Sequence, residues 1–156
     1  MIREACKNDL EAVHELIREL AEYERAPGEV TLSHEQLKAD FTDAKPDFHG
    51  LVADDAGRII GMALYFYTYS TWKGRCLYLE DMIVTENYRG RGHGKQLFEK
   101  LIQIAAEANA QRMMWQVLDW NEPAIRFYRK YNADLDPEWV NGKFTREQIE
   151  QMAKQN

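Results

Sequence analysis

Apolar residues recur between residues 8 and 25 three or four positions apart. This spacing places one apolar face toward a core and predicts an amphipathic helix. Asn8 can cap the start of this helix. A second, shorter helix is predicted after Ser33, because Ser33 and Gln36 stand at the spacing of a capping box. A short strand at residues 2–5 precedes both helices.

The middle of the chain changes to the pattern of β-strands. Residues 49–53, 58–69 and 75–84 are rich in aliphatic and aromatic residues that favour strands. Turn-forming residues separate these runs at 54–57 and 70–74. Strands joined by such short turns pair with their neighbours in antiparallel fashion, so the sequence predicts a meander of three strands.

Helical spacing returns after a glycine-rich turn and runs to about Asn109, and a strand is predicted at 113–118. Because a helix separates that strand from the strand at 75–84, the two are expected to run parallel. Asn121 can cap the next helix, and Pro123 falls in its first turn, where a missing N–H costs nothing.

The C-terminal segment holds weaker signals. A short strand is predicted around residues 139–140, followed by a turn at Asn141-Gly142. A last helix is announced by Thr145 and Gln148 at capping-box spacing. We therefore predict an α/β (α+β) fold in one domain over residues 1–156. Its sheet is mixed and mostly antiparallel, with helices on both faces.

Charge and composition restrict the function. The formal net charge is −6, which argues against nucleic acid as the main partner because phosphate backbones are bound by surfaces dense in Lys and Arg. The first residues lack the apolar core of a signal peptide, and no apolar run approaches the length of a membrane span. We therefore expect a cytoplasmic protein that has no membrane contact.

Cysteines and histidines give no sign of a disulfide framework or a metal site. Cys6 and Cys76 are too few for such a framework and have no metal-like spacing. The four histidines, which are His14, His34, His49 and His93, are scattered without a ligand pattern. We expect no bound metal.

The turn at residues 88–94, Tyr-Arg-Gly-Arg-Gly-His-Gly, joins a predicted strand to a predicted helix. Such a turn presents backbone N–H groups and the positive end of a helix dipole, which can receive a phosphate. Nearby basic residues favour this interpretation over a simple tight turn, which the glycines alone would allow. The fingerprint of dinucleotide-binding proteins has glycine at its first, third and sixth positions, and here Gly90 and Gly92 are followed by Lys95 at the sixth. The lysine pattern of a Walker phosphate-binding loop is also absent from the sequence.

Four short segments in a fixed order carry a resemblance to a known family. They are Tyr23-Glu24, Leu79-Glu80-Asp81, the loop with Arg89, Gly92 and Gly94, and Trp120-Asn121-Glu122-Pro123 leading to Phe127-Tyr128. In these segments the chain resembles the GCN5-related N-acetyltransferase (GNAT) superfamily. It is more closely similar to the diamine (spermidine/spermine) N-acetyltransferases, and the similarity runs from Ile2 to about Ala153.

The resemblance implies a set of site residues and acetyl-CoA as co-substrate. It assigns the pyrophosphate to Arg89, Gly90, Arg91, Gly92, His93, Gly94 and Lys95. It assigns the pantetheine arm and thioester to backbone groups of Met82, Ile83 and Val84, with Asn121 touching the cofactor where two parallel strands splay apart. Tyr23, Glu24, Glu80 and Glu138 would bind the amine, and Tyr128 would donate a proton to departing CoA. The resemblance also implies a homodimer.

The proposed chemistry requires a proton acceptor. An alkylammonium with a pKa near 10.4 leaves only about one molecule in a thousand neutral at pH 7. We expect Glu24 and Glu138 to hold a distant ammonium of the substrate while the attacking nitrogen loses its proton through water to Glu80. The alternative for these acids is ordinary solvated surface charge.

Two further groups would act on the thioester. Tyr128 can donate to the leaving sulfur by its phenol, although it could instead be one more aromatic residue on a core-facing helix. A backbone N–H near Ile83 or Val84 could stabilise the oxyanion if a β-bulge left it unpaired by the sheet.

Three functions remain open at this point. The leading one is acetylation of a primary amine of a polyamine or related small diamine. A second keeps acetyl-CoA but takes thialysine, another amine or a protein lysine as acceptor. A third is a non-catalytic acyl-CoA sensor.

The chain also departs from the family at Asn132, where the family usually has a glycine that ends the helix in the left-handed conformation.

Overall fold

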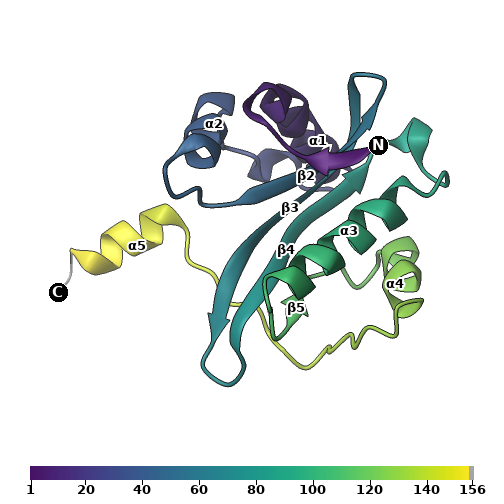
Figure 1. Ribbon diagram of the computed structural model, residues 1–156. Coiled ribbons are helices and arrows are strands. Elements are labelled where there is room, and N and C mark those ends of the chain that lie inside the picture. Colours follow the sequence, from purple (N-terminus) through teal and green to yellow (C-terminus); the bar gives the residue numbers. More distant parts are fainter. Residues whose placement is uncertain (155–156) are drawn as a thin grey trace. The chain divides into compact units, whose positions relative to one another are not determined.

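The computed structural model describes residues 1–154 (Figure 1). The chain divides into two compact units, one from Met1 to Leu118 and one that begins at Asp119. Among the described residues, the first unit holds the sheet and three α-helices, and the second holds two α-helices. No helix within residues 1–154 is both long enough and apolar enough to cross a bilayer.

The sheet has five strands in the order β1-β2-β3-β4-β5. Their bounds are β1 Ile2–Glu4, β2 His49–Asp55, β3 Arg58–Ser70, β4 Gly74–Val84 and β5 Met113–Met114. The first three pairings are antiparallel and the pairing of β4 with β5 is parallel. The predicted meander and the predicted parallel strand are therefore both confirmed.

Three α-helices belong to the first unit, and they are α1 Leu10–Tyr23, α2 His34–Thr42 and α3 His93–Glu107. The Ser33 hydroxyl accepts a hydrogen bond from the Gln36 N–H at 3.1 Å, which confirms the predicted cap. The Gln36 side chain does not close the capping box, because it donates instead to Asp40 at 2.6 Å.

The start of α1 differs from the prediction. Asn8 lies inside a short 3₁₀ turn, Lys7–Asp9, and α1 begins one residue after that turn. The physical reason is the Asp9 carboxylate, which accepts from the Cys6 N–H at 2.7 Å and so stabilises the turn ahead of the helix.

The core on one face of the sheet is built against α1 and α2. Its buried residues are Val13, Leu16, Leu37, Val52, Met62, Leu64 and Ile83. On β3, Met62 and Leu64 point to this face, so Ala63 and Tyr65 point to the other face, since side chains alternate along a strand. α3 covers that other face with buried Leu97, Phe98 and Leu101 (Figure 1).

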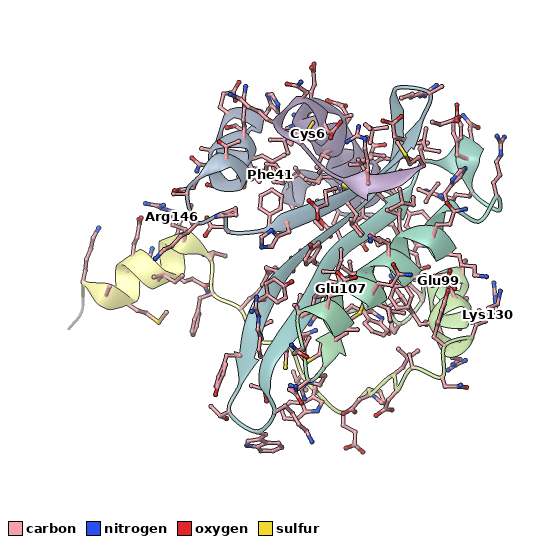
Figure 2. All side chains as sticks on the ribbon, viewed as in Figure 1. Cys6, Phe41, Glu99, Glu107, Lys130 and Arg146 are labelled. Atoms are coloured by element: carbon pink, nitrogen blue, oxygen red, sulfur yellow. The ribbon has the colours of Figure 1, made fainter. Side chains whose placement is uncertain are left out.

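Aromatic packing places α2 against the sheet. Figure 2 shows the Phe41 side chain pointing from α2 toward β2. Its ring centroid lies 5.5 Å from that of Phe48, which is partly buried beside the core. A side chain at Gly50 would meet Ala5 at 3.1 Å and Leu64 at 3.2 Å, so this glycine allows the segments to approach closely.

The second unit contains α4 Glu122–Arg129 and α5 Arg146–Ala153. The Asn121 side chain accepts from the Ala124 N–H at 3.3 Å, which confirms the cap of α4. At α5 the capping box is complete, since Thr145 and Gln148 each accept a hydrogen bond from the other's backbone N–H, at 3.3 and 2.8 Å.

Two predicted strands are wrong in extent or existence. Only Met113–Met114 of the predicted 113–118 run forms a strand, because pairing with β4 ends there. Residues 139–140 form no strand. By contrast, Asn132 has the left-handed φ of 56°, as expected for the end of α4.

Candidate active site

A β-bulge at Glu80 interrupts the pairing of β3 with β4. Leu64 lies opposite Asp81 and Tyr65 lies opposite Leu79, so Glu80 has no opposing residue on β3. The expectation of a bulge near Ile83 or Val84 is therefore wrong in position, because those two residues pair in regular register with Met62 and Gly61.

The bulge changes which face each acid occupies. In a regular strand Leu79 and Asp81 would share one face of the sheet. Here Leu79 shares the face of Tyr65, whereas Asp81 shares the face of Leu64, on which α1 and α2 pack. Glu80 is exposed and Asp81 is half-buried. The extra residue thus places the Asp81 carboxylate on the face of the sheet where α1 packs.

Three carboxylates interact in this region. Burial, and to a lesser degree the negative charges of Glu80 and Glu24, together raise the pKa of Asp81 from its ordinary 3.8 to about 6. Burial also raises the pKa of Glu24. We define these three residues, Glu24, Glu80 and Asp81, as the acidic group. Such a set attracts a cation and can hold a proton near neutral pH.

Asp81 is the functional candidate that sequence reasoning did not assign. Two consecutive acids in an otherwise apolar strand were visible in the segment Leu79-Glu80-Asp81. The face that each acid takes depends on the bulge, however, and the sequence gives no sign of where the register shifts.

The end of α1 contributes the expected amine-binding residues. The helix closes after Tyr23 because Arg25 takes a left-handed φ of 63° and the Ala26 N–H bonds to the Ala21 carbonyl at 2.8 Å. Glu24 caps this end and is half-buried. The negative end of the helix dipole and the Glu24 carboxylate both favour a cation here.

The glycine-rich turn has the backbone that phosphate binding needs. Gly90 and Gly92 take left-handed φ angles of 75° and 88°, which glycine adopts without strain. Gly92 caps α3, and the 15-residue helix begins at His93. Gly90, Arg91, Gly92 and Lys95 are exposed, whereas His93 and Gly94 are half-buried. The first-turn N–H groups of a helix and nearby cations suit a diphosphate.

The last part of β4 is paired on one side only. β5 pairs with β4 at Leu77 and Tyr78. From Met82 to Val84, β4 pairs with β3 but with no described strand on its other side. This open edge is where backbone groups of β4 can meet an extended ligand, as expected for the pantetheine arm.

Arg89 stands apart from the other basic residues of the turn. Its Nε donates to the Val84 carbonyl at 2.7 Å, and its guanidinium lies 3.6 Å from a carboxylate oxygen of Glu19 on α1. By comparison, Lys95 pairs with Glu99 one turn along α3, at 3.8 Å.

The remaining predicted site residues belong to the second unit. Asn121 caps α4, and Tyr128 lies in the same helix with its ring centroid 5.3 Å from that of Phe127. Glu138 lies outside regular secondary structure, is exposed, and donates its backbone N–H to Asp136 at 2.8 Å.

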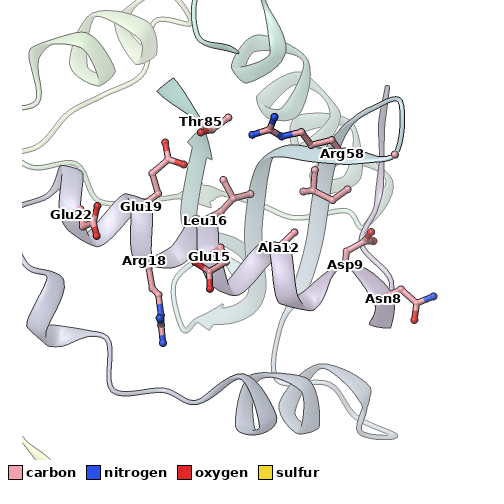
Figure 3. A pocket seen from close by; sticks show the side chains of 12 residues that line it. Asn8, Asp9, Ala12, Glu15, Leu16, Arg18, Glu19, Glu22, Arg58 and Thr85 are labelled. Carbon is pink, nitrogen blue, oxygen red and sulfur yellow. The ribbon is translucent and has the colours of Figure 1, made fainter. Parts of the chain in front are cut away.

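An open groove of about 770 Å³ runs along α1 beside the start of β3 (Figure 3). Its lining includes Glu15, Arg18, Glu22 and Arg58. None of the predicted site residues lines it, so it is distinct from the candidate active site.

Comparison with known proteins identifies the class. Residues 10–133 match the model of the Acetyltransferase (GNAT) family. A thialysine N-epsilon-acetyltransferase of Bos taurus is 40% identical over 141 residues, which cover 85% of this chain and 83% of that protein. A spermidine/spermine N(1)-acetyltransferase-like protein of Homo sapiens is 35% identical over 162 residues, covering 97% of this chain and 23% of the human protein.

Solved structures agree on the fold. An integron cassette protein from the mobile metagenome of V. cholerae has a TM-score of 0.80 at 24% identity, covering 99% of this chain and 97% of the other. An aminoglycoside acetyltransferase from a soil metagenomic sample has a TM-score of 0.77 at 21% identity, covering 93% and 95%.

The chain belongs to the GNAT family of acetyltransferases. It is an acetyltransferase that acts on amines, and acetyl-CoA is its co-substrate. Two features fit that co-substrate. The turn with the left-handed Gly90 and Gly92 offers N–H groups at the start of α3 to a diphosphate. The open edge of β4 offers backbone groups to the extended pantetheine arm.

Proposed function

We propose that the protein transfers the acetyl group of acetyl-CoA to a primary amine of a polyamine or related small diamine. The observation that carries this proposal is the acidic group, in which Glu24 and Glu80 lie close enough to Asp81 for their charges to raise its pKa. Carboxylates at a helix C-terminus favour a dication over a neutral or anionic acceptor. The names of the similar acetyltransferases, for thialysine and for spermidine/spermine, support an amine of this kind.

The predicted site residues other than Arg89 take the following roles in this proposal. Gly90 to Lys95 would receive the phosphates, and the backbone from Met82 to Val84 would receive the pantetheine arm and thioester. Asn121 would contact the cofactor, and Tyr128 would donate a proton to the departing thiolate. Tyr23, Glu24, Glu80 and Glu138 would bind the amine.

Proton removal from the amine is assigned to the pair Glu80 and Asp81. A free carboxylate with an ordinary pKa of about 4 is a poor acceptor from an ammonium near 10.4. The raised pKa of Asp81, about 6, narrows that gap by about two pKa units. We therefore propose that Glu80 attracts the ammonium while Asp81 receives its proton, directly or through water.

The second candidate acceptor is thialysine. Several similar proteins carry that name, and thialysine shares a terminal aminoalkyl group with the diamines. The two classes differ at the far end of the molecule, where thialysine carries a carboxylate. Thialysine also carries an α-ammonium at that end, and its carboxylate would have to lie away from the acidic group. Relative rates with the two classes therefore distinguish them.

Domain organisation, assembly and location complete the proposal. We propose that both compact units form one acetyltransferase domain, because the family match from 10 to 133 crosses the boundary at Asp119. We also propose a homodimer, by resemblance to the diamine acetyltransferases. A cytoplasmic location is supported by the two free thiols, Cys6 and Cys76.

The test is thiol release from acetyl-CoA with a panel of amines. Spermidine, putrescine, thialysine and lysine are supplied to the purified protein, and CoA thiol is measured over time. Release with a diamine or polyamine supports the proposal, and release with thialysine alone supports the second candidate. Binding of acetyl-CoA with no release for any amine would indicate a non-catalytic acyl-CoA sensor and contradict both.

A pair of variants on α1 tests the acidic group. Glu24→Gln should raise KM for the accepted diamine about tenfold, because it removes one of three charges that hold the cation. The matched control is Glu22→Gln, an exposed acid two residues earlier on the same helix. Equal KM values for the two variants would remove Glu24 from the site.

A further inference from the structure

Arg89 reaches from the glycine-rich turn to two other elements. Its Nε donates to the carbonyl of Val84, the last residue of β4, at 2.7 Å. Its guanidinium nitrogen lies 3.6 Å from Oε1 of Glu19, and the centre of the guanidinium lies 5.1 Å from the ring centroid of Tyr23. Three contacts thus connect one side chain to the end of β4 and to α1.

Glu19 reinforces this connection from the side of α1. The same oxygen, Oε1, accepts from the backbone N–H of Glu86 at 3.1 Å, in the short turn that follows β4. Figure 3 shows the Glu19 side chain pointing from α1 toward Thr85 at the end of β4. Because Glu19 and Tyr23 are four residues apart, they lie on one face of α1, where a single guanidinium can contact both.

The neighbouring cations lie in different surroundings. Arg91 is exposed, and its guanidinium lies 5.1 Å from the ring centroid of Tyr88 within the same turn. The Lys95 side chain is 65% exposed and its partner Glu99 lies on the same helix. Within residues 1–154, neither of these two side chains contacts α1. Each can therefore move toward a phosphate without breaking a contact with the helix that carries the expected amine-binding residues.

We propose that Arg89, held by Glu19, is a positioning residue for the amine side of the reaction and not a phosphate ligand. It fixes the last turn of α1, which ends at Tyr23 and is capped by Glu24, against the end of β4. The role rests on the proposed function, since it presumes that this turn binds the amine.

The chemistry of arginine suits this role. A guanidinium can donate to a carbonyl, pair with a carboxylate and lie over an aromatic ring at the same time. A lysine keeps the charge but lacks the planar group and the Nε donor. Arg89→Lys therefore retains the positive charge near the turn but cannot make the three contacts at the same time.

The experiment compares four variants by amine KM, by kcat and by the Kd of CoA from calorimetry. Arg89→Lys and Glu19→Gln should each raise the amine KM about fivefold or more and leave the Kd of CoA within about twofold. Arg91→Gln should show the opposite pattern. Glu15→Gln, an exposed acid one turn before Glu19 on the same helix, should change neither quantity.

The outcomes separate this role from the proposed function. If Arg89→Lys weakens CoA binding about tenfold and leaves the amine KM unchanged, Arg89 is a phosphate ligand and the proposal is overturned. A Glu19→Gln protein identical to wild type would overturn it as well. A wild-type protein that binds CoA but acetylates no amine would overturn the proposed function itself, and this role with it.

Discussion

A Cβ atom at Gly61 would lie 2.8 Å from the carbonyl oxygen of Ile83. It would also lie 3.1 Å from a methyl carbon of Val84 and 3.3 Å from the Val84 Cα. Two of these neighbours are backbone atoms of β4, which cannot turn aside as a flexible side chain can. Gly61 therefore sets how closely β3 approaches β4 at the strand end where the thioester is expected.

We predict that Gly61→Ala displaces the end of β4. Overpacking of a buried site typically costs about 1–3 kcal/mol, so the free energy of unfolding should fall by that amount in urea titration. The Kd of CoA should rise with it, because the open edge of β4 moves. Gly28→Ala is the control, since a Cβ there has no neighbour within 4 Å. Unchanged stability in Gly61→Ala would show that β4 adjusts freely.

At low pH the folded protein should lose the stabilisation that the ionised Asp9 carboxylate provides. Hydrogen bonds from Arg3, at 2.7 and 2.9 Å, lower the pKa of Asp9 from 3.8 to about 2 in the folded protein. A lowered pKa stabilises the fold above the unfolded value and loses that stabilisation as pH falls from about 4 to 2. We estimate the contribution at about 2 kcal/mol.

The measurement for Asp9 is thermal unfolding of wild type and Asp9→Asn across pH 2 to 7. The wild type should be more stable above pH 4, and the difference should shrink toward pH 2, where its carboxyl is protonated. A difference that stays constant over this range would mean that the charge of Asp9 contributes nothing.

Tyr128→Phe should lower kcat at least about tenfold while acetyl-CoA still binds. The substitution removes only the phenol hydroxyl, which in the proposed mechanism protonates the departing thiolate. Single-turnover kinetics and calorimetry measure the two quantities. Tyr131→Phe provides a matched control, because Tyr131 also packs on Phe127, at 5.4 Å. Full turnover in Tyr128→Phe would require another proton donor.

Asp81→Asn should change the pH dependence of the reaction. In wild type, kcat/KM should rise as pH passes through about 6, where Asp81 loses its proton and becomes an acceptor. It should climb further toward pH 8.5 as more amine becomes neutral. The variant should lose the rise near pH 6 and about tenfold in kcat/KM. A rise near pH 6 that persists in Asp81→Asn would assign it to another group.

Local signals predicted much of this fold. Ser33, Asn121 and Thr145 act as helix caps because a cap requires only a few consecutive residues. The left-handed conformation of Asn132 is equally local. These helix ends could therefore be read from short segments of the chain, whereas the predicted cap at Asn8 was wrong.

The features that escaped prediction depend on strand pairing. The run from Trp115 to Leu118 suits a strand, yet β5 ends at Met114 and leaves the edge of β4 beyond Tyr78 without a partner on that side. The bulge at Glu80 is likewise a matter of register between two strands. The resemblance assigns the proton to Glu80 alone, whereas the register places Asp81 on the side of α1.

The unpaired position of Glu80 gives β4 an unusual tolerance to a change of length. Excision of this one residue would leave Leu79 opposite Tyr65 and Asp81 opposite Leu64, with every other side chain on its present face. Excision of any other paired residue of β4 would shift the register by one residue, and the side chains on one side of the deletion would then point to the opposite face of the sheet. A carboxylate can therefore be added to or deleted from this acetyltransferase scaffold without rebuilding the layers on either side of the sheet.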